Sequence, residues 1–168
     1  MNPNNPLKEY YIKGVEGFPS LLIRFADSAI AEIRFLHKMP LRRPKILLND
    51  EEKTIINKLE KDILAYFRGV KTDFRKYKIQ HGVGTPFQKK IWQRIKTIPY
   101  GQIRTYKWLA EKAGKSNASR AAGNACGKNP VPILVPCPRI VASSGSLGGF
   151  SGGVEIKRRL LRLEGVSK

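Results

Sequence analysis

The hydrophobic pattern of the first half predicts a small sheet followed by one helix. Residues 9–17 and 20–37 contain short apolar runs with loose alternation, which is typical of strands. A turn is expected at Ala26-Asp27-Ser28, between two of these runs. Apolar residues at helical spacing follow the acidic run 50–52, which suits a helix N-terminus, and Gly69 is expected to end the helix.

Residues 70–84 are basic and have no clear period. We interpret them as an extended connection between two subdomains. The sequence therefore predicts a small α/β domain over residues 1–78 and a second domain over residues 79–168. His81 lies in this connection, where a lone histidine is expected to be solvated.

The second half changes to helical spacing. Thr85 is expected to cap a helix that has Pro86 in its first turn. A short helix is predicted from Thr105 through Lys112, and a second over residues 117–126, capped by Ser116 or Asn117. Two short helices joined by a few residues fit a helix-turn-helix, and a final helix is expected from Val154 to Glu164.

The fold class that follows is α+β. An N-terminal α/β domain, an antiparallel sheet plus a helix, precedes a mainly helical C-terminal domain with a helix-turn-helix.

The second helix of that pair is made almost entirely of small residues. Arg120 is its one long charged side chain, and Ser119, Ala121 and Gly123 are among its small neighbours. A smooth helix can lie close against a nucleic-acid groove, with the arginine reaching past it into the base stack. Tight packing against another helix explains the same composition, so both interpretations stay open.

Alternating prolines in residues 129–141 exclude an interior helix. The apolar residues between them predict a buried extended segment that positions Cys137. The following Gly/Ser loop, residues 142–153, could wrap a ligand through its backbone. A rigidly placed cysteine beside such a loop suggests a nucleophile, although a buried structural cysteine is the alternative.

The net charge of the chain narrows the classes of molecule that it could bind. The chain has 32 Lys and Arg against 13 Asp and Glu, a formal net charge of +19. A surplus of this size attracts polyanions and favours a nucleic-acid partner. A basic surface inherited from a heat-adapted or generally basic proteome is the alternative.

The two cysteines, Cys126 and Cys137, and the two scattered histidines do not suggest a zinc site or a disulfide framework. We expect no metal and no cofactor. There is no apolar run long enough for a transmembrane helix and no apolar signal core at the start, so a cytoplasmic protein without membrane contact is expected.

Residues 124–141 (NACGKNPVPILVPCPRIV) closely resemble the active-site segment of the O6-alkylguanine-DNA alkyltransferases, also called methylated-DNA–protein-cysteine methyltransferases. The resemblance runs from about Thr85 to the C-terminus and includes PYGQIRTY before the helix-turn-helix and SLGGFSGG after the cysteine. The first half is consistent with the variable N-terminal domain of this family but does not identify it.

The resemblance implies a role for several residues. Cys137 matches the alkyl acceptor and Arg120 the arginine that replaces the flipped nucleotide. Tyr106 matches the tyrosine that helps rotate the nucleotide and could give a proton to the leaving guanine. Asn129 matches the asparagine that supports the active-site turn, and Glu164 the carboxylate of a proton relay.

The resemblance also implies a lesion-binding pocket. Ser151, with Gly152, matches the binding loop, and Phe150 stands where the family has an aromatic residue, often tyrosine. The backbone of Val135 would hold the guanine edge. The small face formed by Ser119, Ala121 and Gly123 would lie against DNA.

The implied function is single-turnover repair of O6-alkylguanine, with O4-alkylthymine as a second candidate lesion, in double-stranded DNA, by a monomer without a cofactor. One departure is serious, because the family reads Pro-Cys-His-Arg and this chain has Pro138 in place of the histidine. Proline cannot pass a proton to Glu164.

Two alternatives therefore remain. A non-catalytic, alkyltransferase-like protein would bind the lesion only, but such proteins replace the acceptor cysteine, which this chain keeps. A plain helix-turn-helix protein would need base-reading side chains that this helix lacks.

Overall fold

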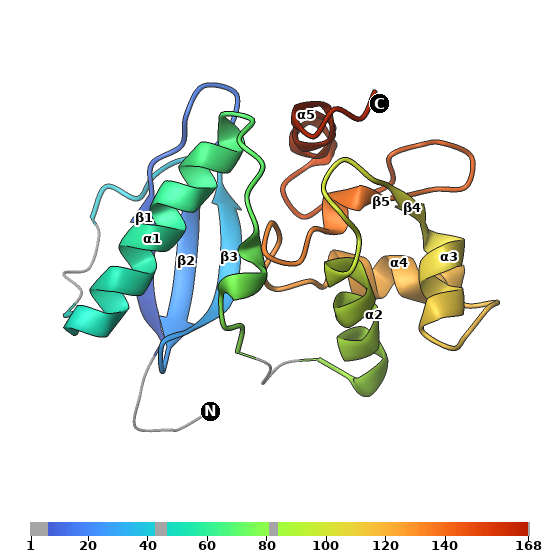
Figure 1. The fold of residues 1–168 in the computed structure, drawn as a ribbon, viewed down its shortest axis with the longest axis horizontal. Coiled ribbons are helices and arrows are strands. Elements are labelled where there is room, and N and C mark those ends of the chain that lie inside the picture. Colours follow the sequence, from blue (N-terminus) through green and yellow to red (C-terminus); the bar gives the residue numbers. More distant parts are fainter. Residues whose placement is uncertain (1–6, 43–46, 81–83, 168) are drawn as a thin grey trace. The chain divides into compact units, whose positions relative to one another are not determined.

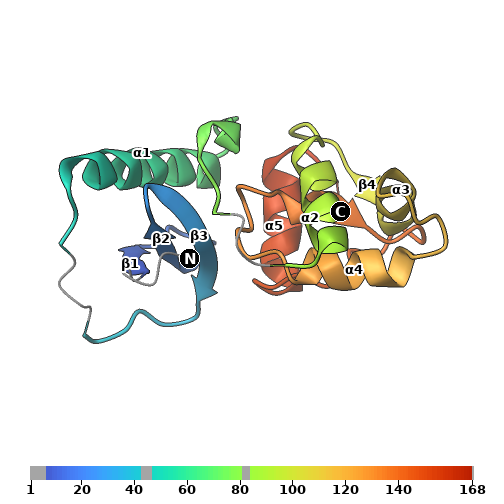
Figure 2. The same cartoon turned by 90° about the horizontal axis from the view of Figure 1, so that it is seen from below.

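The computed structural model describes residues 7–42, 47–80 and 84–167. The chain forms two compact units, Met1–Gly82 and Val83–Lys168. Each unit has its own core, and each is described here by itself (Figures 1 and 2).

The first unit contains an antiparallel sheet in the order β1-β2-β3 and one long helix. Asp27 and Ser28 both have positive φ, 51° and 58°, which is the geometry of a tight two-residue hairpin turn. The predicted turn is therefore confirmed, whereas the first strand is shorter than the predicted residues 9–17. The elements are β1 (Lys8–Ile12), β2 (Ser20–Ala26), β3 (Ala29–Leu36) and α1 (Asp50–Phe67).

Helix α1 covers one face of this sheet (Figure 2). Its first turn is closed by a capping box, in which Asn49 and Glu52 each accept a hydrogen bond from the other's backbone N–H. Lys8 of β1 donates to Glu52 at 2.6 Å, and Tyr10 donates to Glu60 at 2.6 Å. The apolar core between helix and sheet includes Leu21, Ile23, Phe25, Ile33, Ile56, Leu59 and Ile63.

The predicted extended connection is wrong for its first part. Residues Phe74–Lys76 form a 3-10 turn, and Ile79 pairs with Ile30 of β3. Phe74 and Tyr77 are buried in the first unit, where the Phe74 ring packs against Tyr66 at the end of α1 and the Tyr77 ring packs near Phe74. The aromatic side chains, which have no helical or strand period, hold this segment against the unit. His81 lies outside the described residues.

The second unit is mainly helical, with a two-stranded parallel pair, β4 and β5. Thr85 caps α2 as predicted and forms a capping box with Gln88. The stripe Ile91, Ile95 and Ile98 is buried. The elements are α2 (Pro86–Lys96), β4 (Arg104–Thr105), α3 (Tyr106–Lys112), α4 (Ser119–Gly127), β5 (Ile140–Val141) and α5 (Val154–Leu163).

Helices α3 and α4 pack on each other as the predicted helix-turn-helix pair (Figure 1). Thr105 caps α3 by accepting from the backbone N–H of Trp108 at 3.1 Å. The predicted cap of the second helix is wrong, since the N-cap is Ala118, which offers no side-chain acceptor. The chain instead turns before the helix, where the N–H of Ala118 donates to the carbonyl of Lys115.

The segment before Cys137 is buried as predicted but is not extended. Val135 N–H donates to Val131 O, and Ile133 has a φ of 80°, so the chain folds into a tight turn. Residues Cys137–Arg139 then form a 3-10 turn with Pro138 in its first part. Alternating prolines exclude an α-helix without enforcing a straight chain, because proline also fits turns.

Candidate active site

The sulfur of Cys137 lies at the start of the 3-10 turn, inside the second unit. Only 3% of the residue is exposed. The backbone N–H of Cys137 donates to Val135 O at 2.7 Å, which fixes the turn just before the cysteine. The position of the Cys137 backbone is therefore fixed by this turn.

Asn129 connects the end of α4 with the cysteine turn. Its Nδ2 donates to Cys137 Sγ at 3.1 Å and to Val135 O at 2.8 Å, and its Oδ1 accepts from Val131 N–H at 3.1 Å. The N–H of Val131 must face the oxygen of the amide, so the orientation of Asn129 is set by the network. An N–H donor therefore points at the sulfur.

The second cysteine, Cys126 of α4, is buried beside the first. Its Sγ lies 4.0 Å from the carbonyl oxygen of Cys137. Hydrogen bonding from Cys126 lowers the pKa of Cys137, burial opposes this, and hydrogen bonding from Asn129 and the charge of Lys157 lower the pKa further. The pKa of Cys126 is raised by hydrogen bonding to Cys137 and by burial. Cys137 is thus the more acidic thiol of the pair.

Tyr106 is the first residue of α3, and its half-buried ring lies between α4 and the Gly-rich loop. A Cβ placed at Gly148 would come within 2.6 Å of the Tyr106 hydroxyl, and one at Gly123 would lie 3.6 Å from the ring. Burial raises the pKa of Tyr106 to about 12, with contributions from Cys126 and Cys137. The hydroxyl therefore keeps its proton at neutral pH.

Glu164 is buried at the C-terminal end of α5 and is bound by Arg139. Arg139 Nε donates to Glu164 Oε2 at 2.9 Å, and a second guanidinium N–H donates to Oε1 at 3.0 Å. Gly101 N–H also donates to Oε2, at 3.1 Å. Pro138 is buried and offers no titratable group between Cys137 and this carboxylate.

The exposed side of α4 presents a narrow stripe. Arg120, Asn124 and the C-cap residue Lys128 are exposed at i, i+4 and i+8, with Ala121 exposed between them. Ser119 is half-buried at the start of the helix, and Gly123 faces the Tyr106 ring. Ala122, Ala125 and Cys126 form the buried side. Small residues of α4 therefore pack in the core on one side of the helix and keep its exposed side smooth.

The lesion-binding residues expected from the sequence lie on two segments. Ser151 is exposed and Phe150 and Gly152 are half-buried on the loop before α5. Val135 is buried, and its carbonyl already accepts from Asn129 and Cys137. The loop also packs at Gly148 against Tyr106.

Sequence reasoning missed Lys157 of α5. This lysine is 0% exposed, and its Nζ donates to Ile140 O at 2.6 Å. Lys157 stands three and four residues before Leu160 and Leu161, both buried, so its place on the apolar stripe was the available signal.

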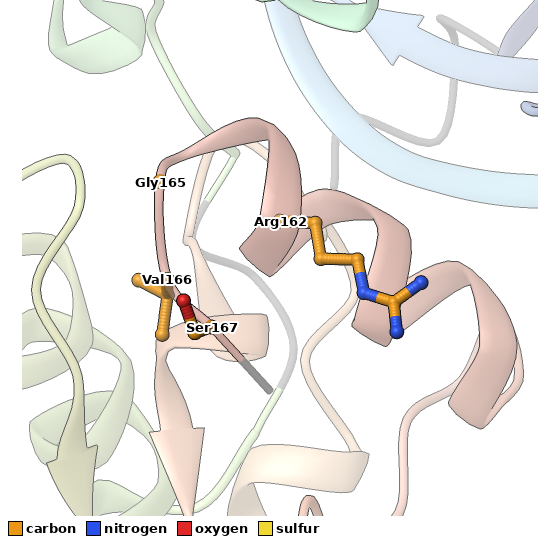
Figure 3. A pocket seen from close by; sticks show the side chains of 4 residues that line it. All are labelled: Arg162, Gly165, Val166 and Ser167. Carbon is orange, nitrogen blue, oxygen red and sulfur yellow. The ribbon is translucent and has the colours of Figure 1, made fainter.

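A surface pocket at the end of α5 holds none of these residues. It is lined by Arg162, Gly165, Val166 and Ser167, and the Arg162 side chain extends away from Val166 and Ser167 (Figure 3). In the described ranges, no group of three His, Cys, Asp or Glu side chains could hold a metal ion. The helices of those ranges include none with the length and apolar character needed to cross a lipid bilayer.

Residues 86–166 match the family model of the 6-O-methylguanine DNA methyltransferase DNA-binding domain. A methylated-DNA–protein-cysteine methyltransferase of Methanosarcina acetivorans is 39% identical over 147 residues, which cover 86% of this chain and 91% of the relative. One from Shigella flexneri is 49% identical over 82 residues, 49% of this chain and 48% of that relative.

Solved structures of other proteins are similar in fold to this chain over nearly its whole length. The crystal structure of Mycobacterium tuberculosis O6-methylguanine methyltransferase has a TM-score of 0.77 at 31% identity, covering 95% of this chain and 93% of that one. A structure of the M. tuberculosis OGT in complex with DNA has a TM-score of 0.74 at 34% identity, covering 92% and 90%. The chain belongs to the methylated-DNA–protein-cysteine methyltransferase family.

Proposed function

We propose that this protein repairs O6-alkylguanine in double-stranded DNA by moving the alkyl group onto the sulfur of Cys137. The family supplies the class of reaction, a DNA-repair methyl transfer to a protein cysteine. The observation that carries the residue assignment is the Asn129 amide, which donates to a buried Cys137 sulfur in the same unit as the helix-turn-helix.

Helix α4 is the proposed DNA-contacting element. Its exposed stripe combines Arg120 and Lys128 with the small residue Ala121, so the helix can approach a groove closely. The target oxygen of the lesion lies within the base stack, so the nucleotide must be extruded at a cost of a few kcal/mol. Arg120 would fill the space that it leaves, while lysines and arginines contact phosphates without reading sequence.

The transfer itself is one displacement. The Cys137 thiolate attacks the alkyl carbon, a C–S bond forms, and the bond between that carbon and guanine O6 breaks. The electron pair stays on the guanine, which takes a proton from the Tyr106 hydroxyl or from water. Tyr106 is suited to this role because burial keeps its hydroxyl protonated at neutral pH.

The loop before α5 would hold the extruded base. Ser151 and Gly152 would offer backbone groups, and Phe150 would form an apolar wall. Glu164 is bound by Arg139 and Gly101, so we assign it to anchoring the end of α5 beside the cysteine turn. The thioether on Cys137 is stable, so each protein molecule acts once.

We further propose a monomer in the cytoplasm. Cys137, Tyr106 and Arg120 all come from one unit of one chain, so no second copy is required to complete the site. The two free thiols suit a reducing compartment that contains DNA. Sedimentation of the protein with and without duplex DNA tests the oligomeric state.

The deciding experiment is the intact mass of the protein after incubation with a duplex that carries O6-methylguanine. A gain of one methyl group, mapped to the Cys137 peptide, is expected. An undamaged duplex and a Cys137→Ser variant are the controls. If the lesion stays in the DNA while the protein binds it, the protein is a lesion binder, and the proposal is wrong.

A further inference from the structure

Trp92 of α2 donates a hydrogen bond across the second unit to the last turn of α4. Its indole Nε1–H lies 2.8 Å from the carbonyl oxygen of Ala125, and both residues are buried. On the far edge of the indole, a Cβ placed at Gly84 would come within 2.6 Å of Cη2, so the ring is closely packed there. The side chain of Trp92 therefore connects α2 to the end of α4 at a fixed place.

The carbonyl of Ala125 lies at the point where α4 either continues or ends. In a continuing α-helix it would accept from the N–H of Asn129, four residues later. The N–H of Asn129 instead donates to Cys126 O at 3.2 Å, and among the hydrogen bonds of the described residues only the indole reaches Ala125 O. Because a buried carbonyl without a donor is costly, the indole N–H makes it possible for Asn129 to leave the helix.

The place where α4 ends decides where the side chain of Asn129 points. From its position just past the helix, Asn129 Nδ2 donates to Cys137 Sγ at 3.1 Å and to Val135 O at 2.8 Å. One further residue of helix would move the backbone N–H of Asn129 from Cys126 O to Ala125 O and would carry the side chain with it. Both hydrogen bonds to the cysteine turn would then be lost.

We propose that Trp92 is a positioning residue for the alkyl transfer, because it occupies the Ala125 carbonyl, fixes the residue at which α4 ends, and so holds the Asn129 amide against Cys137. The inference rests on Cys137 being the alkyl acceptor. Trp92 acts through Asn129, so the indole N–H should matter for transfer only while Asn129 is present. A residue that merely filled the core would lower the rate whether or not Asn129 were there.

The test is a double-mutant cycle on the single-turnover rate of methyl transfer from a duplex that carries O6-methylguanine, at a temperature where circular dichroism shows every variant folded. Trp92→Phe removes the N–H and should slow transfer by about tenfold. Asn129→Ala should slow transfer at least as much. In the double variant, Trp92→Phe should cause no further loss, because the residue that Trp92 positions is gone. An unchanged rate in Trp92→Phe, or losses that multiply in the double variant, would overturn the proposal.

A tryptophan analogue covers the case in which Trp92→Phe does not fold. Benzothienylalanine has sulfur in place of the indole N–H and keeps the shape of the side chain; incorporated at position 92 by stop-codon suppression, it should slow transfer as much as Trp92→Phe. Incorporation at position 108 is the matched control, since the indole N–H of Trp108 has no acceptor among the described residues. Equal rates for the two labelled proteins would refute a role of the Trp92 hydrogen bond.

A measurement without methyl transfer separates this proposal from the proposed function. The side-chain amide protons of Asn129 are buried and hydrogen-bonded, so their exchange with solvent, followed by ¹⁵N-resolved NMR, should be slow in the natural sequence. Trp92→Phe should speed this exchange by about tenfold or more. Equal exchange in the two proteins would contradict the positioning of Asn129. If the exchange changes as expected but no methyl group is transferred by the natural sequence, the proposed function is wrong and the positioning stands.

Discussion

At the scale of single residues, Pro138 stands in place of the family's proton-accepting histidine, and fixed polar groups lie in the site instead. Asn129 is oriented by Val131, so its N–H faces Cys137 without rearrangement. Lys157 is fixed by the Ile140 carbonyl. Fixed donors and charges stabilise an anion without reorganisation during the reaction, which is the property that favours catalysis in a buried site.

Restoring the histidine should therefore change little. A general base typically contributes about 100- to 10,000-fold to a rate when the proton must still be removed. If Cys137 rests as a thiolate, Pro138→His should raise the single-turnover rate on methylated duplex by less than about tenfold. Quench-flow with mass detection of methylated protein measures this rate, and a gain of 100-fold or more would mean that Cys137 rests as a thiol.

Cys126 should act on its neighbour through its S–H group. Cys126→Ala removes the donor, so the pKa of Cys137 should rise, and a smaller fraction should be thiolate at pH 7. Cys126→Ser keeps a donor of similar size and is the matched control. The thiolate absorbance near 240 nm, titrated in both variants, measures the change; equal midpoints for Ala and Ser would rule out this hydrogen bond.

At the scale of elements, α4 has to pack in the core on one face and leave its other face free of bulky side chains. Its inner face is smooth because Ala122 and Ala125 are packed in the core, and Gly123 admits the Tyr106 ring. Its outer face is nearly bare apart from Arg120, Asn124 and Lys128. A helix of this kind suits close contact with a groove more than base reading, which needs several long polar side chains.

Arg120 should matter only when a nucleotide has to leave a duplex. Arg120→Ala should reduce transfer from duplex DNA by about tenfold or more, because extrusion costs a few kcal/mol that the arginine offsets. Transfer from free O6-methylguanine base should be unchanged, since nothing is flipped. Single-turnover rates on the two substrates give the comparison, and an equal loss on both would place Arg120 in folding or chemistry instead.

Two adjacent glycines offer a matched pair in the loop before α5. Gly148 has a φ of +69°, and a Cβ there would lie 2.6 Å from the Tyr106 hydroxyl, whereas a Cβ at Gly149 meets nothing within 4 Å. Gly148→Ala should displace Tyr106 and destabilise the fold by about 1–3 kcal/mol through overpacking. Denaturant unfolding and the rate of methyl transfer measure both effects, and Gly149→Ala should be near neutral in each.

The sequence was most informative where local signals decide the structure. The caps Thr85 and Thr105 each place a side-chain oxygen where a helix begins, and the structure has both. The turn at Asp27 and Ser28 was likewise predicted from the sequence, and the structure has it. Ser116 and Asn117 resembled caps equally well, but α4 begins at Ser119 after Ala118, which has no side-chain cap hydrogen bond.

Tertiary contacts explain what the sequence could not provide. Lys157 reads as one of four basic residues in the last helix, and only the folded unit shows that it is buried beside Ile140. The ion pair of Arg139 with Glu164 joins residues 25 positions apart. The assignment of Cys137 as the proposed acceptor rests on a segment that resembles a family, and the hydrogen bonds of Cys137 depend on turns that proline spacing does not specify.

At the scale of the whole molecule, charge and chemistry are separated in the second unit. The formal charge of +19 belongs to the chain as a whole. The buried site is close to neutral once Cys137 is an anion, because Arg139 is paired with Glu164. Exposed lysines and arginines can therefore attract DNA without disturbing the ionisation of the cysteine, since screening by water and salt weakens their effect on buried groups.

Affinity for undamaged duplex should consequently be set by counterion release. The logarithm of the association constant should fall linearly with the logarithm of salt concentration, by about 0.9 per phosphate neutralised. Lys128→Ala removes one exposed cation from the stripe on α4 and should make the slope shallower by about one, with little dependence on sequence. Fluorescence anisotropy over a salt series measures the slope.

The buried lysine supplies the control for this measurement. Lys157→Arg leaves the exposed charge unchanged, so its salt slope should equal that of the natural sequence. An unchanged slope in Lys128→Ala would remove that end of α4 from the DNA-binding surface. A change in the rate of methyl transfer from saturated complexes of Lys128→Ala would mean that the surface charge also acts on Cys137.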